Sequence, residues 1–210
     1  MPKNVIMLEF LSTHQNRILE IIGVITSLLY LYFSVRESIW LWLFGLISSA
    51  VYVWVFYQAS LYADAGLYVY YVLISVYGWL HWYRGSSKTQ EADDLQITRT
   101  SQRDGAVYAL TALLLFAGMA WGLHFTDSDV PYGDAFTTSL SVVATYMLAR
   151  KKLEQWMIWI VVDAFAMGLY LYKAMYPTAG LFLVYTVLAI WGHFRWKKHM
   201  QHQQYAAAGA

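Results

Sequence analysis

The chain has 210 residues, of which 59% are apolar and 13% are charged, and its mean hydropathy is +0.41. Soluble domains carry about 25% charged residues, so the composition argues against a soluble globular enzyme and excludes a disordered chain. The lack of cysteine excludes disulfides and thiolate metal sites, and a net charge of +1 is too small to indicate a nucleic-acid partner.

Seven apolar stretches have about the length that a helix needs to cross a bilayer, which is about 20 residues. In chain order, the predicted spans are Ile18–Val35, Ile39–Tyr57, Ala65–Trp82, Ala106–Phe125, Ala135–Ala149, Trp156–Tyr172 and Thr178–Phe194. So many spans leave no polar residues to form a soluble shell around them. The sequence therefore predicts an all-α, multi-pass membrane protein that sits in the lipid bilayer.

The basic residues divide unequally between the two sides of the predicted spans. The side with the N-terminus holds Lys3, Arg17 and Lys173, whereas the side with the C-terminus holds the other eleven of the 14 Lys and Arg residues. Cytoplasmic loops carry the excess of positive charge in membrane proteins. We therefore expect the N-terminus outside and the C-terminus in the cytoplasm.

The two halves of the chain resemble each other at a shift of 114 residues. The matched pairs include Trp42 and Trp156, Gly66 and Gly180, Tyr71 and Tyr185, Gly78 and Gly192, and Trp82 and Trp196. In the first span of each half the register is left open, because a slip of two residues would align Tyr30 with Tyr146.

This repeat predicts seven transmembrane helices in a 3+1+3 arrangement, with two like-oriented triple-helix bundles joined by a connecting helix. Such parallel repeats occur in one group of secondary transporters, whose substrate lies near the membrane midplane. The expected segments are an N-terminal extracytoplasmic segment at 1–17, a first bundle at 18–83, a cytoplasmic linker at 84–105, the connecting helix at 106–125, an external loop at 126–134, a second bundle at 135–196 and a cytoplasmic tail at 197–210.

The strongest candidate site is on the sixth span. Asp163 is an acidic residue near the middle of that span, where an ionisable group is costly and marks function by default. Trp156, Trp159 and Asp163 have the i, i+3, i+7 spacing of one helix face. Two indoles and a carboxylate suit a flat cationic ring. Alternatively, Trp156 belongs to the interfacial aromatic belt, and the carboxylate is paired with a neighbour or held neutral.

The repeat makes this face asymmetric, because Gly45 and Ser49 stand where the second half has Trp159 and Asp163. We expect the second half to hold the substrate and the first half to make room for it. Tyr68 and Tyr71 on the third span are weaker candidates for substrate binding, since helix packing also explains them. The sequence shows no catalytic cluster, metal-ligand spacing or cofactor motif, so no enzyme activity, metal or cofactor is expected.

Several segments resemble the PnuC family of vitamin transporters. In the first half these are Tyr57–Asp64 and Ser75–Trp79. In the second half they are Leu148–Lys151, the WxxWxxxD run from Trp156 to Asp163, Leu171–Lys173 and Thr178–Ala179.

The resemblance implies a facilitator of the bacterial inner membrane with a SWEET-like 3+1+3 fold, often a homotrimer. It implies transport of nicotinamide riboside, with thiamine or another vitamin as the alternative, and trapping of the arrived vitamin by cytoplasmic phosphorylation. It also places Trp156 and Trp159 in the binding site. Asp163 and Tyr68 depart from the family, which often has Asn and Gln at these positions. A membrane receptor or scaffold is the alternative of a different class.

Overall fold

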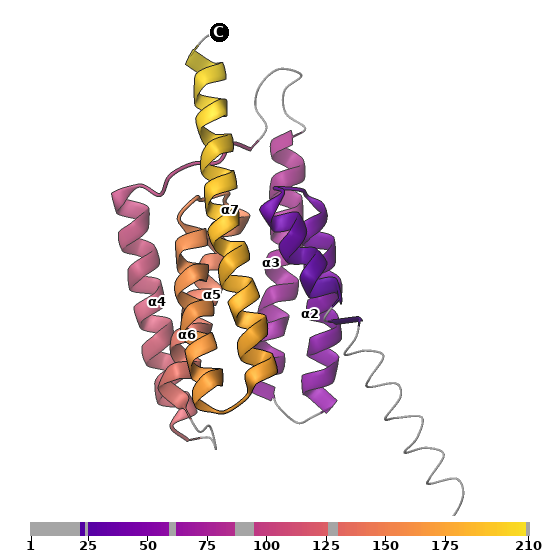
Figure 1. The fold of residues 1–210 in the computed structure, drawn as a ribbon, viewed down its shortest axis with the longest axis vertical. Coiled ribbons are helices and arrows are strands. Elements are labelled where there is room, and N and C mark those ends of the chain that lie inside the picture. Colours follow the sequence, from indigo (N-terminus) through magenta and orange to yellow (C-terminus); the bar gives the residue numbers. More distant parts are fainter. Residues whose placement is uncertain (1–21, 24, 59–61, 87–94, 126–129, 209–210) are drawn as a thin grey trace, which may run out of the picture. The chain divides into compact units, whose positions relative to one another are not determined.

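The computed structural model describes residues 22–23, 25–58, 62–86, 95–125 and 130–208 (Figure 1). The predicted N-terminal segment at 1–17, the start of the first span and residues 126–129 of the predicted external loop lie outside this range. The chain divides into two compact units, Met1–Arg84 and Gly85–Ala210.

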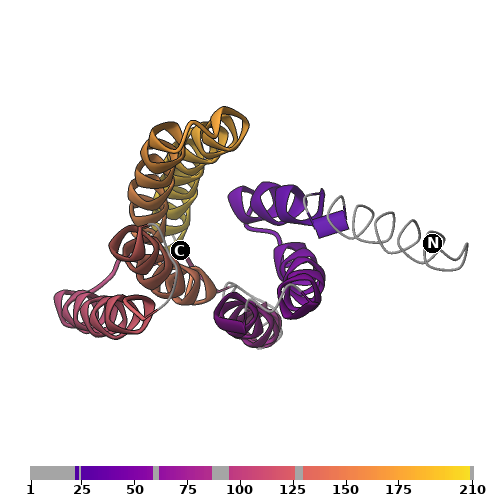
Figure 2. The ribbon, with the colours of Figure 1, turned by 90° about the horizontal axis from the view of Figure 1, so that it is seen from below.

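The first unit contains the helix Ile25–Val35 and helices α2 (Trp40–Gln58) and α3 (Tyr62–Ser86). The second unit contains α4 (Gln102–Leu123), α5 (Pro131–Ala149), α6 (Gln155–Tyr172) and α7 (Tyr176–Ala208). Each helix of the second unit packs against the next one in the chain, and α4 lies at one edge of the unit (Figure 2). Helices are therefore present at the predicted spans within the described residues. Most boundaries differ by a few residues, but α7 continues to Ala208, 14 residues beyond the predicted end at Phe194.

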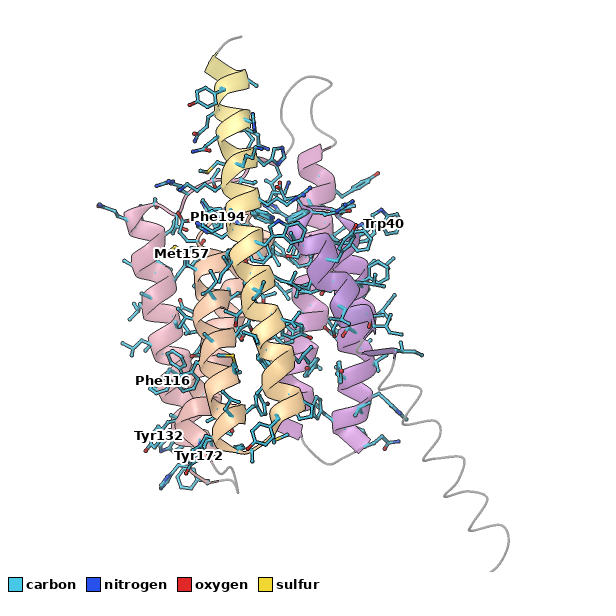
Figure 3. The ribbon with its side chains drawn as sticks, viewed as in Figure 1. Trp40, Phe116, Tyr132, Met157, Tyr172 and Phe194 are labelled. Atoms are coloured by element: carbon cyan, nitrogen blue, oxygen red, sulfur yellow. The ribbon has the colours of Figure 1, made fainter. Side chains whose placement is uncertain are left out.

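Four of the described helices are long and apolar enough to cross a membrane: α2, α4, α6 and residues 176–206 of α7. The tyrosines of α3 and the hydroxyl residues of α5 make these two helices less apolar. Large apolar side chains cover the outer surfaces, and Figure 3 shows Met157 and Phe194 pointing outward, with 56% and 63% of their surface exposed. An apolar exterior of this extent suits contact with lipid and not with water.

The ends of the helices follow from local sequence. The Ser101 hydroxyl accepts a hydrogen bond of 3.1 Å from the Asp104 backbone N–H and so caps the start of α4. Pro131 opens α5, where its missing N–H costs no helical hydrogen bond. The segment 95–101, which was predicted as part of a polar linker, lies against the loop between α5 and α6, where Thr98 pairs with Lys152 in a parallel bridge.

The loop that follows the first helix of each half has the same backbone geometry in both units. Glu37 and Lys151 both have a positive φ, of 57° and 48°. The Ser38 N–H donates to Phe33 and the Lys152 N–H donates to Met147, over 3.0 and 2.9 Å. These are the hydrogen bonds of a Schellman motif, and each residue in one loop is 114 positions from its counterpart.

The register of the first helix in each half follows from these loops. The Arg36 N–H donates to the carbonyl of Tyr32, and the Arg150 N–H donates to that of Tyr146. Tyr146 therefore corresponds to Tyr32, and the alternative alignment with Tyr30 is wrong. The error arose because tyrosines two positions apart give almost the same match in an apolar stretch, whereas the hydrogen bonds of the turn allow one register.

Candidate functional site

Helix α6 carries the candidate site and packs between α5 and α7. Its buried residues are Gln155, Trp156, Val162, Asp163 and Ala166. Separations of seven and three residues, as between Trp156, Asp163 and Ala166, mark one face of the helix. The face that sequence analysis singled out is therefore the one that turns toward the neighbouring helices of the unit.

Trp156 is enclosed by α7. Its side chain is 1% exposed, and its ring centroid lies 5.7 Å from that of Trp196, nearly perpendicular to it at 82°. A Cβ atom at Gly192 would come within 2.7 Å of the Trp156 ring, so the glycine is what allows the indole to lie against the α7 backbone. These contacts account for Trp156 as a packing residue.

The first unit repeats this arrangement. Trp42 lies 5.6 Å from Trp82 at 90°, and a Cβ atom at Gly78 would come within 2.4 Å of the Trp42 ring. A residue that packs identically in both units serves the fold in both. The packing therefore favours a structural role for Trp156, and binding by this residue stays a prediction.

Trp159 lies on the same stripe of α6, between Trp156 and Asp163, and is half-buried. In the described part of the chain no other ring packs on its indole. Its counterpart is Gly45, where a Cβ atom would come within 2.9 Å of the Tyr30 ring and 3.1 Å of the Ser75 hydroxyl. The space at Gly45 is thus filled by Tyr30, and the expectation that this glycine makes room for substrate is corrected.

Asp163 is 5% exposed, and its carboxylate makes no hydrogen bond or ion pair with any residue that the structure describes. A buried carboxylate without a partner is costly, because burial removes the water that solvates the charge. Two buried hydroxyls of the neighbouring α5 are already used, since Thr145 donates to Ser141 over 2.8 Å and Ser139 donates to Phe136 over 3.1 Å. Asp163 is therefore the one buried carboxylate among the described residues of the second unit.

Tyr68 and Tyr71 belong to α3 of the first unit. The Tyr68 ring lies 5.0 Å from Tyr52 and 5.3 Å from Phe56, both on α2, and 5.6 Å from Tyr71. The structure brings these tyrosines together in an aromatic cluster that joins α2 to α3. Aromatic pairs at these distances stabilise packing, and a role in substrate binding stays a prediction for both residues.

Sequence analysis missed Gln155, the first residue of α6. The side chain is completely buried, and neither its Nε2 nor its Oε1 atom has a hydrogen-bond partner among the residues that the structure describes. Its counterpart in the first unit is Leu41, which is also completely buried. A glutamine opposite a leucine at a matched core position is the signal that could have identified it.

This comparison gives a stability prediction. We expect Gln155→Leu to stabilise the protein by about 1 kcal/mol, because it removes two buried polar groups that lack partners. The reverse change at the matched site, Leu41→Gln, should destabilise it by at least as much. Thermal unfolding of both variants in detergent tests this, and a lower unfolding temperature for Gln155→Leu would show that the glutamine has a stabilising partner.

The described residues contain no group of three or more His, Asp or Glu side chains that could hold a metal ion. The chemical features of the site are therefore aromatic surface and one buried carboxylate. They suit recognition of a small organic cation.

Comparison with known proteins assigns the chain to a family. Residues 17–198 match the family described as nicotinamide mononucleotide transporter, which covers most of the chain. The chain belongs to this family. The matched range contains helices α2 to α6 and α7 as far as residue 198.

Individual family relatives are distant in sequence. The nicotinamide riboside transporter PnuC of Escherichia coli (strain K12) is 24% identical over 201 residues, with 85% of this chain and 84% of the relative covered. The riboflavin/roseoflavin transporter RibM of Streptomyces davaonensis is 25% identical over 178 residues, covering 84% and 83%. These two relatives are about equally similar to the chain, and they are named as transporters of two different vitamins.

A solved structure supports the fold. The crystal structure of the vitamin B3 transporter PnuC superposes with a TM-score of 0.70 at 23% sequence identity, covering 94% of this chain and 88% of that chain. The two chains therefore share a fold over nearly their whole length. The comparisons name transporters, in agreement with the expectation of a protein that is not an enzyme.

Proposed function

We propose that this protein is a facilitative transporter that carries nicotinamide riboside across the bacterial inner membrane, and that Asp163 and Trp159 bind the cationic ring of the substrate. The observation that carries the proposal is the buried Asp163 carboxylate, which has no partner among the described residues. A pyridinium ring supplies the missing positive charge. A desolvated cation over an indole face gains about 2 kcal/mol, and Trp159, which is half-buried one helical turn before Asp163, would provide that face.

The architecture belongs to the same proposal. Two like-oriented triple-helix bundles, with α4 as the connecting helix, would form the 3+1+3 arrangement. It is supported by the matched loops at Glu37 and Lys151 and the matched packing of Trp42 and Trp156. The distribution of Lys and Arg supports an external N-terminus and a cytoplasmic C-terminus. A homotrimer and trapping by cytoplasmic phosphorylation are supported by the resemblance of the motifs to the PnuC family.

Riboflavin is the second candidate substrate, because a named riboflavin/roseoflavin transporter is 25% identical to this chain. Its ring system is uncharged, so it would gain stacking on Trp159 and nothing from the carboxylate. Thiamine, which is cationic, suits Asp163 as well as nicotinamide riboside does. The charge of the ring is thus the property that separates these substrates.

Calorimetric titration of the purified protein with nicotinamide riboside, thiamine and riboflavin tests the proposal. We expect the two cations to bind and riboflavin to bind at least tenfold more weakly. In proteoliposomes without a kinase, uptake should stop when the internal and external concentrations are equal, because a facilitator does not concentrate its substrate. Tight binding of riboflavin alone would overturn the assignment, and the absence of any binding would favour a receptor or scaffold.

Replacement of the aromatic surface tests its contribution. We expect Trp159→Ala to weaken binding of nicotinamide riboside by about 1–2 kcal/mol, or roughly 5- to 30-fold, because the cation loses its stacking partner. Trp159→Phe should retain part of the affinity. Met157→Ala is the matched control, since Met157 is on the same helix but faces outward and is 56% exposed. Equal affinities in Trp159→Ala and Met157→Ala would remove Trp159 from the site.

A further inference from the structure

The segment before α4 is tied to the loop that leads into α6. The Thr98 backbone N–H donates to the carbonyl of Lys151 over 3.1 Å, and the Leu153 N–H donates to the carbonyl of Thr98 over 3.0 Å. Ile97 is 3% exposed, and its N–H donates to the Gln203 side chain on the C-terminal part of α7 over 3.3 Å. Residues 95–101 thus join three elements of the second unit at one end: α4, the α5–α6 loop and α7.

Glu154 makes the side-chain part of this connection. One of its carboxylate oxygens, Oε2, accepts a hydrogen bond of 2.8 Å from the Thr100 backbone N–H and another of 2.8 Å from the Thr100 hydroxyl. Hydrogen bonds to a charged acceptor are stronger than those between neutral groups. Glu154 is also the N-cap residue of α6, yet its side chain makes no capping hydrogen bond to its own helix. The carboxylate is directed to Thr100 instead.

The first unit shows that the turn itself does not require this carboxylate. The residue that corresponds to Glu154 is Trp40, which is 52% exposed. Backbone hydrogen bonds in the two loops are the same, as at Leu41 and Gln155, whose N–H groups donate to Ser38 and Lys152. A glutamate at this place is therefore a feature of the unit that carries Asp163 and is not a requirement of the fold of the loop.

We propose that Glu154 is a positioning residue for the binding face of α6, which it holds in place through Thr100. Helix α6 begins directly after Glu154, and Trp159 and Asp163 follow at about 6 and 12 Å along the axis from its first residue. Since a packed helix moves as a rigid rod, a rotation at its start carries both side chains with it. This inference rests on the proposed function, because it concerns the same binding face.

The test compares affinity with stability in variants of the full-length protein. We expect Glu154→Ala to weaken binding of nicotinamide riboside three- to tenfold at a temperature well below unfolding, and Thr100→Val to weaken it by a smaller factor, since the Thr100 N–H remains. The double variant should bind no more weakly than Glu154→Ala, because both changes remove one shared contact. Thr100→Ser keeps the hydroxyl and is the matched control, with the affinity of the wild type.

The outcomes separate this inference from the proposed function. If the wild-type protein binds and Glu154→Ala binds equally well while unfolding at a lower temperature, Glu154 serves stability alone and the positioning role is wrong. If the losses of the two single variants add in the double variant, Glu154 and Thr100 act separately, which also overturns it. If the wild-type protein binds none of the vitamins, the proposed function fails and this inference fails with it.

Discussion

Asp163→Asn should bind nicotinamide riboside ten- to a hundredfold more weakly than the wild-type protein, which corresponds to about 1.4–2.8 kcal/mol. Asparagine keeps the size of the side chain and removes the charge, so the variant isolates the interaction with a cation. The loss is large because the carboxylate is 5% exposed, and water screens a buried charge only weakly. Calorimetric titration measures the loss.

The stability of Asp163→Asn without ligand should be higher than that of the wild type or unchanged. Without ligand, the wild-type protein buries a carboxylate that has no partner among the described residues, and Asp163→Asn relieves that cost. An unfolding temperature at or above that of the wild type, together with weaker binding, identifies a residue that serves the ligand. A variant that binds as tightly as the wild type would show that Asp163 is not the counter-ion. A much lower unfolding temperature would indicate a structural role instead.

Gly192→Ala and Gly78→Ala should each destabilise the protein by about 2–3 kcal/mol. The added Cβ atoms would come within 2.7 Å of the Trp156 ring and 2.4 Å of the Trp42 ring, closer than real side chains approach. Both indoles are 1% exposed, and each also contacts the tryptophan four residues after its glycine, Trp196 or Trp82, so a ring displaced by the new Cβ atom would disturb the core.

The chain supplies matched controls for this prediction. Gly180 and Gly66 lie on the same two helices, α7 and α3, and a Cβ atom at either position would meet nothing within 4 Å. Alanine there should leave stability unchanged or raise it by about 0.5–1 kcal/mol, since glycine is unfavourable inside a helix. Thermal unfolding in detergent distinguishes the two pairs. Equal unfolding temperatures for Gly192→Ala and Gly180→Ala would contradict the packing described here for Trp156.

Much of the fold could be predicted because apolar length and the repeat are properties of the sequence itself. The described helices lie where the apolar stretches are, and the repeat alone pairs Gly78 with Gly192. The packing of these glycines could not be predicted, since a tryptophan near a helix end has the same appearance whether it faces lipid or a neighbouring helix. The sequence therefore predicts Trp156 as a ligand contact, whereas its surroundings in the structure are those of a core residue.

The candidate site could be predicted only in part, because several of its contacts are made with other helices. Asp163 stands out in any apolar span, and the structure buries it, while its role as the counter-ion stays a prediction. The space at Gly45 was misjudged because Tyr30, which fills it, comes from another helix and is not marked by spacing along α2. Glu154 and Gln155 escaped notice because their significance comes from contacts with Thr100 and from comparison with Trp40 and Leu41.

The measurement that tests the central claim most directly varies the charge of the ligand and leaves the protein unchanged. Nicotinamide riboside and its 1,4-dihydro form differ mainly in that the reduced ring is uncharged. Titrated into the wild-type protein, the oxidised form should bind at least tenfold more tightly, because it alone can pair with Asp163. Equal affinity for the two forms would contradict the account, since the buried carboxylate would then have no part in recognising the ring.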